Sequence, residues 1–346
     1  MKAWRFHGVT NGAENNMHIE NIPFPSHFHN LPPNSTLIKV HSVALNPVDI
    51  KFAETPLVGR FMHALPAIPG LDGVGRVVKT TDPTLNIGQA VTFRKQELQA
   101  EGALTEYVVV SREGCAIVPE GVSLLQAATV GTCGVTAYQA IAPFVLEAKK
   151  ETEQPGLKIF INGGSGGAGV FQIQVAKLLG AQVVTSCSTP NVALCKSLGA
   201  DEVIDYRQGS VGDALKEMVQ REGGSLFDLV VDNVDLPWNL YKAADVYLKE
   251  SGVYVQIGGE FSLQAVKELM YIKLRPVYVG GGQRTWNFMA MKTSREDAEK
   301  VLAWMAEGKV TVPIHSVEEF ENVPEAYRML KTGRARGKIV IRVCEP

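Results

Sequence analysis

The residues best suited to chemistry are three glycines between an apolar run and a helical pattern. Gly164, Gly166 and Gly169 fit G-x-G-x-x-G, after "LKIFI" and before "GVFQIQVAKLLG". Glycine permits a tight turn, lets backbone N–H groups approach a pyrophosphate, and lets a helix pack closely on a strand. A glycine-rich turn without a ligand is the alternative. We expect a dinucleotide-binding segment made of Gly164, Ser165, Gly166, Gly167, Ala168, Gly169 and Val170.

The end of the next apolar run indicates which dinucleotide to expect. Folds that bind NAD usually carry Asp or Glu there, to bind the ribose 2′-hydroxyl. This chain has "VVTSCSTPN", in which Ser186, Ser188, Thr189 and Asn191 are small and neutral. They would admit a 2′-phosphate that a carboxylate would repel, so we expect NADPH rather than NADH. The same residues also suit a turn that caps the next helix, and the two roles are compatible.

The elements that must position these residues divide the chain in two. Up to about residue 118, short strands such as "STLIKVHSVAL" and "LTEYVVV" alternate with Pro/Gly turns. From about residue 156, strands alternate with helices, which predicts right-handed crossovers and a parallel sheet with helices on both faces. We expect the charged segment 146–156 to be a solvated loop entering this second fold.

The final segment should in part return to the β-rich domain, because a chain that inserts one domain into another must return. It contains two amphipathic helices and a closing strand, "GKIVIRV". The expected class is therefore α/β, with three segments: 1–125, a β-rich domain; 126–265, a Rossmann domain with a doubly wound parallel sheet; and 266–346, a C-terminal segment.

The composition argues against several classes of partner. Across 346 residues, 34 basic and 36 acidic side chains leave no overall charge to attract nucleic acid or an anionic membrane. The five cysteines form no C-x-x-C pair, which suits a reducing compartment. No signal or transit pattern opens the chain, and no apolar run is long enough to span a bilayer. We expect a cytoplasmic protein with a small-molecule ligand.

Five motifs together resemble the medium-chain dehydrogenase/reductase superfamily: "NPVD" (46–49), "PGLDGVGRVV" (69–78), "TAYQAI" (136–141), "GGSGGAG" and "LGADEVIDY". The resemblance covers nearly the whole chain and is greatest to the zinc-free quinone oxidoreductases and enoyl reductases. It implies that the first domain is GroES-like and catalytic, and that the Rossmann domain binds NADPH.

Zinc alcohol dehydrogenases of this superfamily carry catalytic Cys, His and Cys ligands in these motifs. By motif position, the residues here are Asn46, Leu71 and Thr132. Leucine cannot bind zinc, and amide and hydroxyl oxygens are poor substitutes for thiolate and imidazole. The four-cysteine structural lobe is missing too, since no cysteine precedes Cys115. We therefore expect no metal.

The resemblance also implies roles for single residues. Asn46 would face the nicotinamide, while Thr132 and Thr136 would contact its carboxamide or the phosphates. Asn191 and Tyr206 would bind the 2′-phosphate, although several relatives place a lysine at the first position, a change for which Lys196 or Arg207 could compensate. Arg334 and Arg336 match a late basic position that reaches the same phosphate. Turn formation around Pro47, a helix N-terminus and solvated arginines are the structural alternatives. Further residues expected at the cofactor are Asn233, Ile257 and Gly258.

The proton donor is less clearly indicated. Enoyl reductases of the mitochondrial type place a tyrosine shortly after the N-P-x-D motif, and this chain has none in residues 50–70. Lys51, His63 or solvent would have to protonate the carbanion, although a solvated lysine and a packed histidine are the alternatives. The expected substrate pocket combines Phe52, Phe61 and Met62 with the late aromatic residues Trp286 and Phe288, which flank Asn287 and could instead bury a dimer contact.

Hydride delivery to an activated C=C bond or a quinone needs no metal, because the substrate's own carbonyl delocalises the charge. The expected function is therefore an NADPH-dependent reductase of α,β-unsaturated carbonyls or quinones. A trans-acting enoyl reductase or tailoring enzyme of secondary metabolism is one alternative, and a non-catalytic nucleotide-binding protein is another. We also expect a homodimer, paired through an edge strand at "RPVYVGG" (275–281).

Overall fold

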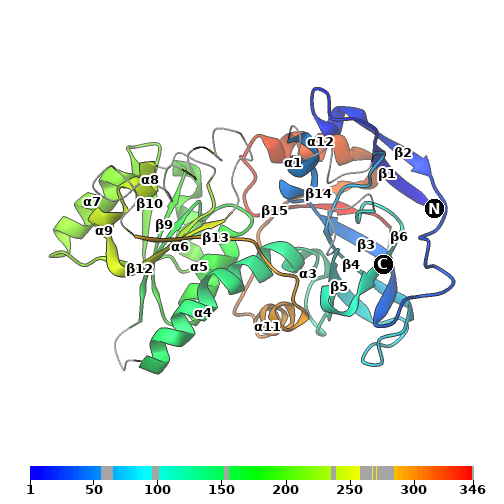
Figure 1. Ribbon diagram of the computed structural model, residues 1–346, viewed down its shortest axis with the longest axis horizontal. Helices are drawn as coiled ribbons and strands as arrows, with labels where there is room; N and C mark the ends of the chain where they lie inside the picture. Colours follow the sequence, from blue (N-terminus) through cyan, green and yellow to red (C-terminus); the bar gives the residue numbers. More distant parts are fainter. Residues whose placement is uncertain are drawn as a thin grey trace. The chain divides into compact units, whose positions relative to one another are not determined.

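The protein divides into two compact units, one of which is built from both ends of the chain. The computed structural model describes residues 1–55, 65–95, 101–151, 156–234, 239–257, 267, 270 and 284–344. Unit 1 comprises Met1–Val135 and Lys292–Pro346, and unit 2 comprises Thr136–Met291. Figure 1 colours the chain by sequence and shows blue and red segments together in unit 1. The boundary predicted at 125/126 lies before the π-helical turn Val130–Gly134, which packs on the unit 1 sheet.

Unit 1 is centred on a largely antiparallel sheet. Within the described residues its strand order is β14-β15-β3-β4-β5-β7, and β6 also pairs with β3. Strands β1 (Lys2–Phe6) and β2 (Met17–Asn21) form a separate antiparallel pair. The sheet strands are β3 (Ser35–Ala44), β4 (Asp72–Thr80), β5 (Ala90–Arg94), β6 (Tyr107–Ser111), β7 (Cys115–Ile117), β14 (Ile314–Glu319) and β15 (Lys338–Arg342).

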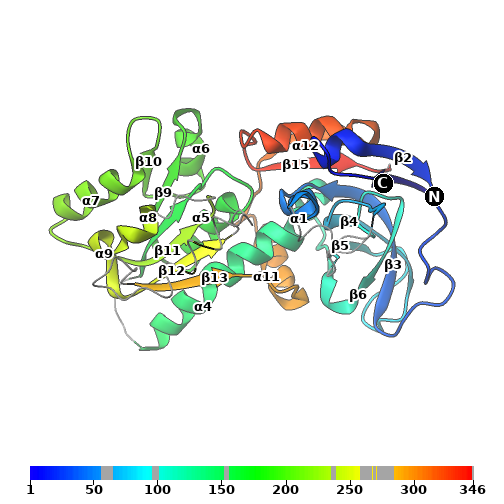
Figure 2. The same cartoon turned by 45° about the horizontal axis from the view of Figure 1, so that its top comes forward.

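The C-terminal elements complete the core of unit 1. Trp4 and Phe320, from opposite ends of the chain, pack their rings 6.3 Å apart, and the Trp4 indole N–H donates to the Phe320 carbonyl at 2.5 Å. Figure 2 shows the red α12 and β15 in the same unit as the blue β1 and β2. The described helices of this unit are α1 (Val48–Glu54), α3 (Leu124–Ala127), α11 (Arg295–Ala306) and α12 (Val323–Lys331).

Unit 2 is a parallel α/β fold. Its strands run in the order β10-β9-β8-β11-β12-β13, and every described pairing is parallel. This order reverses direction at β8, as in doubly wound folds, where ligands bind beyond the carboxyl ends of the strands. The strands are β8 (Lys158–Asn162), β9 (Gln182–Cys187), β10 (Glu202–Asp205), β11 (Phe227–Asp232), β12 (Leu248–Ile257) and β13 (Thr285–Met289).

Helices cover the unit 2 sheet. One core joins Phe160, Val184, Val230 and Tyr254 of the strands to α7, α8 and α9, which gather beside β10 and β12 in Figure 1. Helix α5 packs on β8 and β9 with nearly all of its residues buried. The helices are α4 (Val135–Glu151), α5 (Gly169–Leu178), α6 (Val192–Ser197), α7 (Val211–Arg221), α8 (Asn239–Lys242) and α9 (Ala244–Tyr247).

One predicted loop is largely wrong. Segment 146–156 was expected to be a solvated loop, but α4 continues to Glu151. Leucine, alanine, glutamate and lysine are good helix formers, and on this part of α4 most of their side chains are exposed. Charge alone therefore marked a solvent-facing helix surface rather than a loop. The edge strand expected at 275–281 lies outside the described residues.

Candidate functional site

The glycine segment joins β8 to α5 at the switch point of the unit 2 sheet. Gly163 makes the turn with a φ of 84°, in the left-handed region that favours glycine. Its N–H donates to Ser186 Oγ at 3.0 Å, and the N–H of Gly164 donates to the Ser186 carbonyl at 2.9 Å. The loop is therefore anchored to the end of β9, and α5 begins at Gly169 directly behind it.

The structure explains the glycine at each of the three motif positions differently. A Cβ on Gly164 would lie 2.1 Å from Thr185 Oγ1, and one on Gly169 would lie 2.3 Å from the Gly163 carbonyl oxygen. At both positions, neighbouring protein atoms leave no room for a side chain. A Cβ on Gly166 would meet only the Gly163 oxygen, at an ordinary 3.5 Å. Nothing in the described chain requires glycine at 166, whereas a ligand that approaches the backbone there would.

Three predicted cofactor residues meet beside this loop. Asn191 Nδ2 donates to Ser165 Oγ at 3.1 Å and to Ser188 Oγ at 3.2 Å. Asn191 Oδ1 is buried and has no partner in the described chain. Since a serine hydroxyl can both donate and accept, the opposite amide orientation makes the same contacts and leaves Nδ2 as the buried atom without a partner. The cluster therefore holds one buried polar atom without a partner in the described chain, a donor or an acceptor according to the amide orientation.

Other predicted cofactor residues have structural partners. Ser186 is 1% exposed, and its hydroxyl donates to Asn162 Oδ1 at 2.5 Å, so it holds the loop. Asn233 exchanges two side-chain hydrogen bonds with Gln172, of 2.6 and 2.9 Å. Tyr206 is 47% exposed beside Arg207. Thr136 is buried in α4, and Ile257 ends β12.

Several predicted site residues lie elsewhere or outside the described chain. Arg334 and Arg336 are exposed in the connection from α12 to β15 in unit 1. Lys51 and Phe52 lie on α1 and are half-buried. Trp286 and Phe288 lie on β13, where Trp286 packs against the unit 2 core and Phe288 is 45% exposed. The residues outside the described chain are Phe61, Met62, His63 and Gly258.

Unit 1 contains a buried polar network around Asn46. Its amide Nδ2 donates to Asp72 Oδ2 at 3.0 Å and to the Ala44 carbonyl at 3.2 Å. Its Oδ1 accepts from Lys338 Nζ at 2.5 Å and from the Cys133 thiol at 3.5 Å. Asn46 is 2% exposed. Its side-chain hydrogen-bonding capacity is thus taken up within unit 1.

The network continues through Asp72 to Thr132. Asp72 Oδ1 accepts from the Thr132 hydroxyl at 2.6 Å, and Oδ2 accepts from the Thr132 N–H at 2.9 Å. The Thr132 oxygen in turn accepts from Arg94 Nε at 3.1 Å, and Arg94 Nη1 donates to Thr293 Oγ1 at 2.6 Å. The Thr132 hydroxyl therefore donates its proton to the hydrogen bond with Asp72, while its oxygen accepts from the Arg94 guanidinium.

Burial and charge oppose each other in this network. Burial raises the pKa of Asp72, whereas Lys338 and Arg94 lower it. Burial also raises the pKa of Asp49 to about 7, against the lowering effect of the Asn46 N–H. Asp49 Oδ2 accepts from that N–H at 2.8 Å and from the Tyr327 hydroxyl at 3.1 Å, while Oδ1 has no partner in the described chain.

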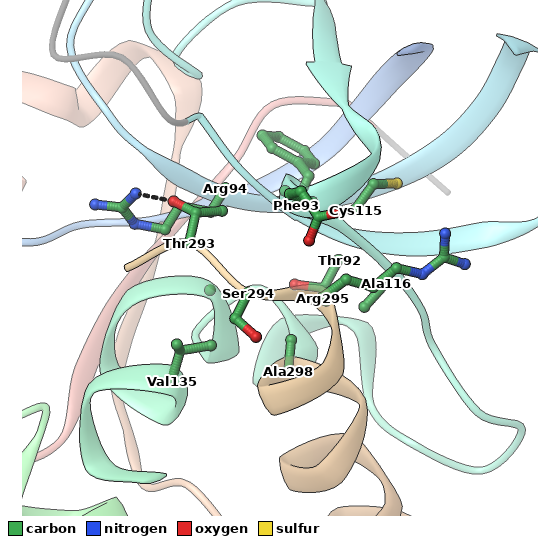
Figure 3. Close-up of a pocket in the computed structure, with 13 residues that line it drawn as sticks. Thr92, Phe93, Arg94, Cys115, Ala116, Val135, Thr293, Ser294, Arg295 and Ala298 are labelled. Atoms are coloured by element: carbon green, nitrogen blue, oxygen red, sulfur yellow. Dashed lines mark hydrogen bonds between the residues drawn. The ribbon is translucent and has the colours of Figure 1, made fainter. Parts of the chain in front are cut away.

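Figure 3 shows the small cavity beside Arg94, where its guanidinium reaches Thr293. Thr92, Phe93, Cys115 and the start of α11 also line it. Its volume is about 10 Å³, room for about one water molecule and far too little for a substrate. Burial raises the pKa of the Cys115 thiol to about 12, so this cysteine is not a nucleophile.

The sequence-based site missed Asp72, Arg94 and Lys338. Asp72 lies in "PGLDGVGRVV" and Lys338 in "GKIVI", but neither spacing nor residue type shows that they meet Asn46. Lys338 is 292 positions away along the chain. A buried charge within an apolar strand was the available signal, since lysine and aspartate are seldom buried without a partner.

Two family models match the chain, the first within unit 1 and the second across the boundary at Met291 from unit 2 into unit 1. Residues 32–120 match the family described as alcohol dehydrogenase GroES-like domain, and residues 198–341 match the family described as zinc-binding dehydrogenase. Positions 46 and 71 lie in the first match, and position 132 lies in neither.

Full-length relatives give the same picture. The chain is 42% identical to a trans-enoyl reductase of Aspergillus terreus, over 100% of this chain and 97% of the relative. It is 32% identical to a mitochondrial NAD(P)H oxidoreductase of Homo sapiens, over 90% and 82%. The solved quinone oxidoreductase from Coxiella burnetii superposes with a TM-score of 0.80 at 27% identity, covering 99% of both chains.

Proposed function

Because the chain belongs to the medium-chain dehydrogenase/reductase superfamily, in the branch of quinone oxidoreductases and enoyl reductases, we propose that it reduces an activated C=C bond or a quinone. It is an oxidoreductase that uses a nicotinamide coenzyme. The observation that carries the coenzyme assignment is the space beside the Gly166 backbone, which no protein side chain fills. Gly164 and Gly169, on either side, are required by the packing of the protein.

The glycine loop fits the pyrophosphate of such a coenzyme. The Gly166 position leaves the backbone open to a ligand, and the N-terminus of α5 lies behind it. Backbone N–H groups at a helix start donate to phosphate oxygens, and the helix dipole favours the negative charge. Bound there, a reduced nicotinamide coenzyme supplies a hydride.

We favour NADPH over NADH, for reasons that lie in unit 2. The cluster of Ser165, Ser188 and Asn191 carries no carboxylate, and its side chains are neutral hydrogen-bonding groups. Asp205, at the end of the neighbouring β10, accepts hydrogen bonds from the Arg207 N–H at 3.0 Å and from Gln208 Nε2 at 3.1 Å. These bonds partly satisfy its carboxylate, while a neutral cluster leaves room for a 2′-phosphate.

We further propose that the reaction is independent of zinc. Of the three ligand positions, Leu71 has no donor atom, and the Thr132 hydroxyl is bound to Asp72 and Arg94. The Asn46 oxygen accepts from the Lys338 ammonium, a cation that would repel a metal ion. The residues present do not fit zinc, so the substrate's own carbonyl must delocalise the charge that hydride transfer creates.

A second candidate is a trans-acting enoyl reductase, which would take its α,β-unsaturated acyl group from a separate carrier protein. The observation in its favour is the 42% identity along the whole chain to a trans-enoyl reductase. The chemistry at the C=C bond is the same in both candidates. Only the group attached to the carbonyl differs.

Absorbance at 340 nm tests both candidates. Purified protein with NADPH is mixed in turn with a small enone, a quinone, an α,β-unsaturated thioester and the same acyl group on a carrier protein. Turnover of the enone or quinone supports the main proposal, and turnover of the carrier-bound substrate alone supports the second. Coenzyme binding without turnover of any of the four would overturn both and favour a nucleotide-binding protein.

We also propose a homodimer. Strand β13 lies at the edge of the described sheet, and its Phe288 is 45% exposed. Such an edge can pair with a second copy across a two-fold axis. Light scattering should give twice the chain mass, and a monomer across a wide concentration range would refute the dimer.

A cytoplasmic location is proposed as well. The described cysteines are free thiols, and four of the five are buried, which suits a reducing compartment. No described helix is long and apolar enough to cross a bilayer. Imaging of a fluorescent fusion should show diffuse cytoplasmic signal, and an organellar pattern would refute it.

A further inference from the structure

Lys338 is a buried lysine with an unusual set of partners. It begins β15, is 3% exposed, and donates to the Leu45 carbonyl at 2.8 Å, to Asn46 Oδ1 at 2.5 Å and to Cys133 Sγ at 3.4 Å. Lys158, which is buried to a similar degree, pairs directly with the Glu222 carboxylate. Within the described chain, Lys338 instead directs its ammonium to neutral acceptors, two on the loop before α1 and one on the turn Val130–Gly134. Burial of a charge among neutral groups is costly.

These contacts select one orientation of the Asn46 amide. The Asn46 oxygen faces the Lys338 ammonium, and the Asn46 NH2 group faces the Asp72 carboxylate. Turning the amide over would place the NH2 group against a cation and the oxygen against an anion. Both contacts would then be repulsive, so Lys338 and Asp72 together hold a single arrangement.

The charge of Lys338 also acts on Asp72. Burial raises the pKa of Asp72, and Lys338 opposes it most strongly, followed by Arg94. Asp49 and Cys133 are the other titratable groups coupled to Asp72. An ionised Asp72 is the acceptor that fixes the Thr132 hydroxyl at 2.6 Å. The positive charge of Lys338 therefore influences the position of the Thr132 hydroxyl through Asp72.

We propose that Lys338 is a positioning residue for the reduction: it fixes the Asn46 amide and, through Asp72, the Thr132 hydroxyl in one hydrogen-bonded arrangement. This inference rests on the proposed reductase function, with Asn46 and Thr132 near the reacting atoms. It makes Lys338 neither a proton donor nor a substrate contact.

The test compares Lys338→Met with Lys158→Met, a matched control that removes an equally buried lysine from unit 2. Lys338→Met should lower kcat about tenfold or more at neutral pH, a typical cost of disturbing groups at the reacting centre. Its coenzyme Kd should remain within about twofold of wild type. Because loss of the cation raises the pKa of Asp72, the acid limb of the kcat profile should move to higher pH. Lys158→Met should lower thermal stability and leave kcat and the profile unchanged.

Lys338→Gln is the second variant, since it keeps an N–H donor for Asn46 if the methionine variant does not fold. It should show the same shift of the acid limb. A wild-type kcat and an unshifted pH profile of kcat in either Lys338 variant would overturn the inference. An equal loss of kcat in Lys158→Met would overturn it too. A wild-type protein that reduces none of the four substrates would instead overturn the proposed function.

Discussion

Gly166→Ala and Gly164→Ala should change different properties, although the residues are two positions apart. The first should weaken coenzyme binding, and the second should lower stability. A Cβ on Gly166 meets no protein atom closer than 3.5 Å, and this glycine does not have a positive φ. Gly166→Ala should therefore leave stability unchanged or raise it by about 0.4–1 kcal/mol, because alanine reduces the freedom of the unfolded chain. If a pyrophosphate approaches this backbone, the methyl group displaces it.

The cost to binding follows from the hydrogen bonds that are lost. One hydrogen bond to a charged group contributes about 1.5–3 kcal/mol, which corresponds to roughly a 10- to 150-fold weaker Kd. Gly164→Ala forces its Cβ to within 2.1 Å of Thr185 Oγ1 and 3.0 Å of Ile173 Cδ1. Overpacking of this kind costs about 1–3 kcal/mol of folding free energy.

Fluorescence titration with NADPH and thermal unfolding separate the two effects. Gly166→Ala should lose affinity and keep its Tm, and Gly164→Ala should lower Tm by about 2–4 °C for each kcal/mol. A Gly166→Ala protein that binds NADPH as tightly as wild type would refute the placement of the pyrophosphate on this loop.

Three further predictions concern other parts of the two sites. Ser188→Asp should weaken NADPH binding more than NADH binding, because it places a carboxylate beside the 2′-phosphate; titration of both coenzymes checks this, and equal losses would contradict it. Thr132→Val removes the hydroxyl that Asp72 and Arg94 hold, so kcat should fall about tenfold with coenzyme Kd nearly unchanged; an unchanged kcat would remove Thr132 from the site. Asp49 has a folded pKa of about 7, raised from 3.8, so the stability it contributes is present at low pH and is lost as pH rises between those values. Urea unfolding should therefore show Asp49→Asn gaining on wild type between about pH 4 and about pH 7, and a constant difference would be inconsistent with the raised pKa.

The sequence could predict what depends on local pattern. The glycine spacing predicted the turn between β8 and α5, and the alternation of strands and helices predicted the parallel sheet, which the structure confirms. The superfamily resemblance is confirmed by the full-length relatives. Local periodicity determines such elements, so a single sequence suffices for them.

What the sequence could not predict depends on contacts between distant segments. Ser186 was expected at the cofactor by its position at the end of β9, but its hydroxyl is used by Asn162 and Gly163. The Lys338 contact with Asn46 joins the last strand to an early loop. The charged end of α4 was misread because charge marks exposure and does not distinguish a helix surface from a loop.

The fate of the transferred hydride tests the central claim most directly. The protein is given NADPH labelled with deuterium at C4 of the nicotinamide and an enone that it turns over, and the product is analysed by NMR. Transfer to an activated C=C bond predicts deuterium at the β-carbon, with the α-proton taken from solvent. Deuterium on the carbonyl carbon of an alcohol product would show carbonyl reduction and contradict the account.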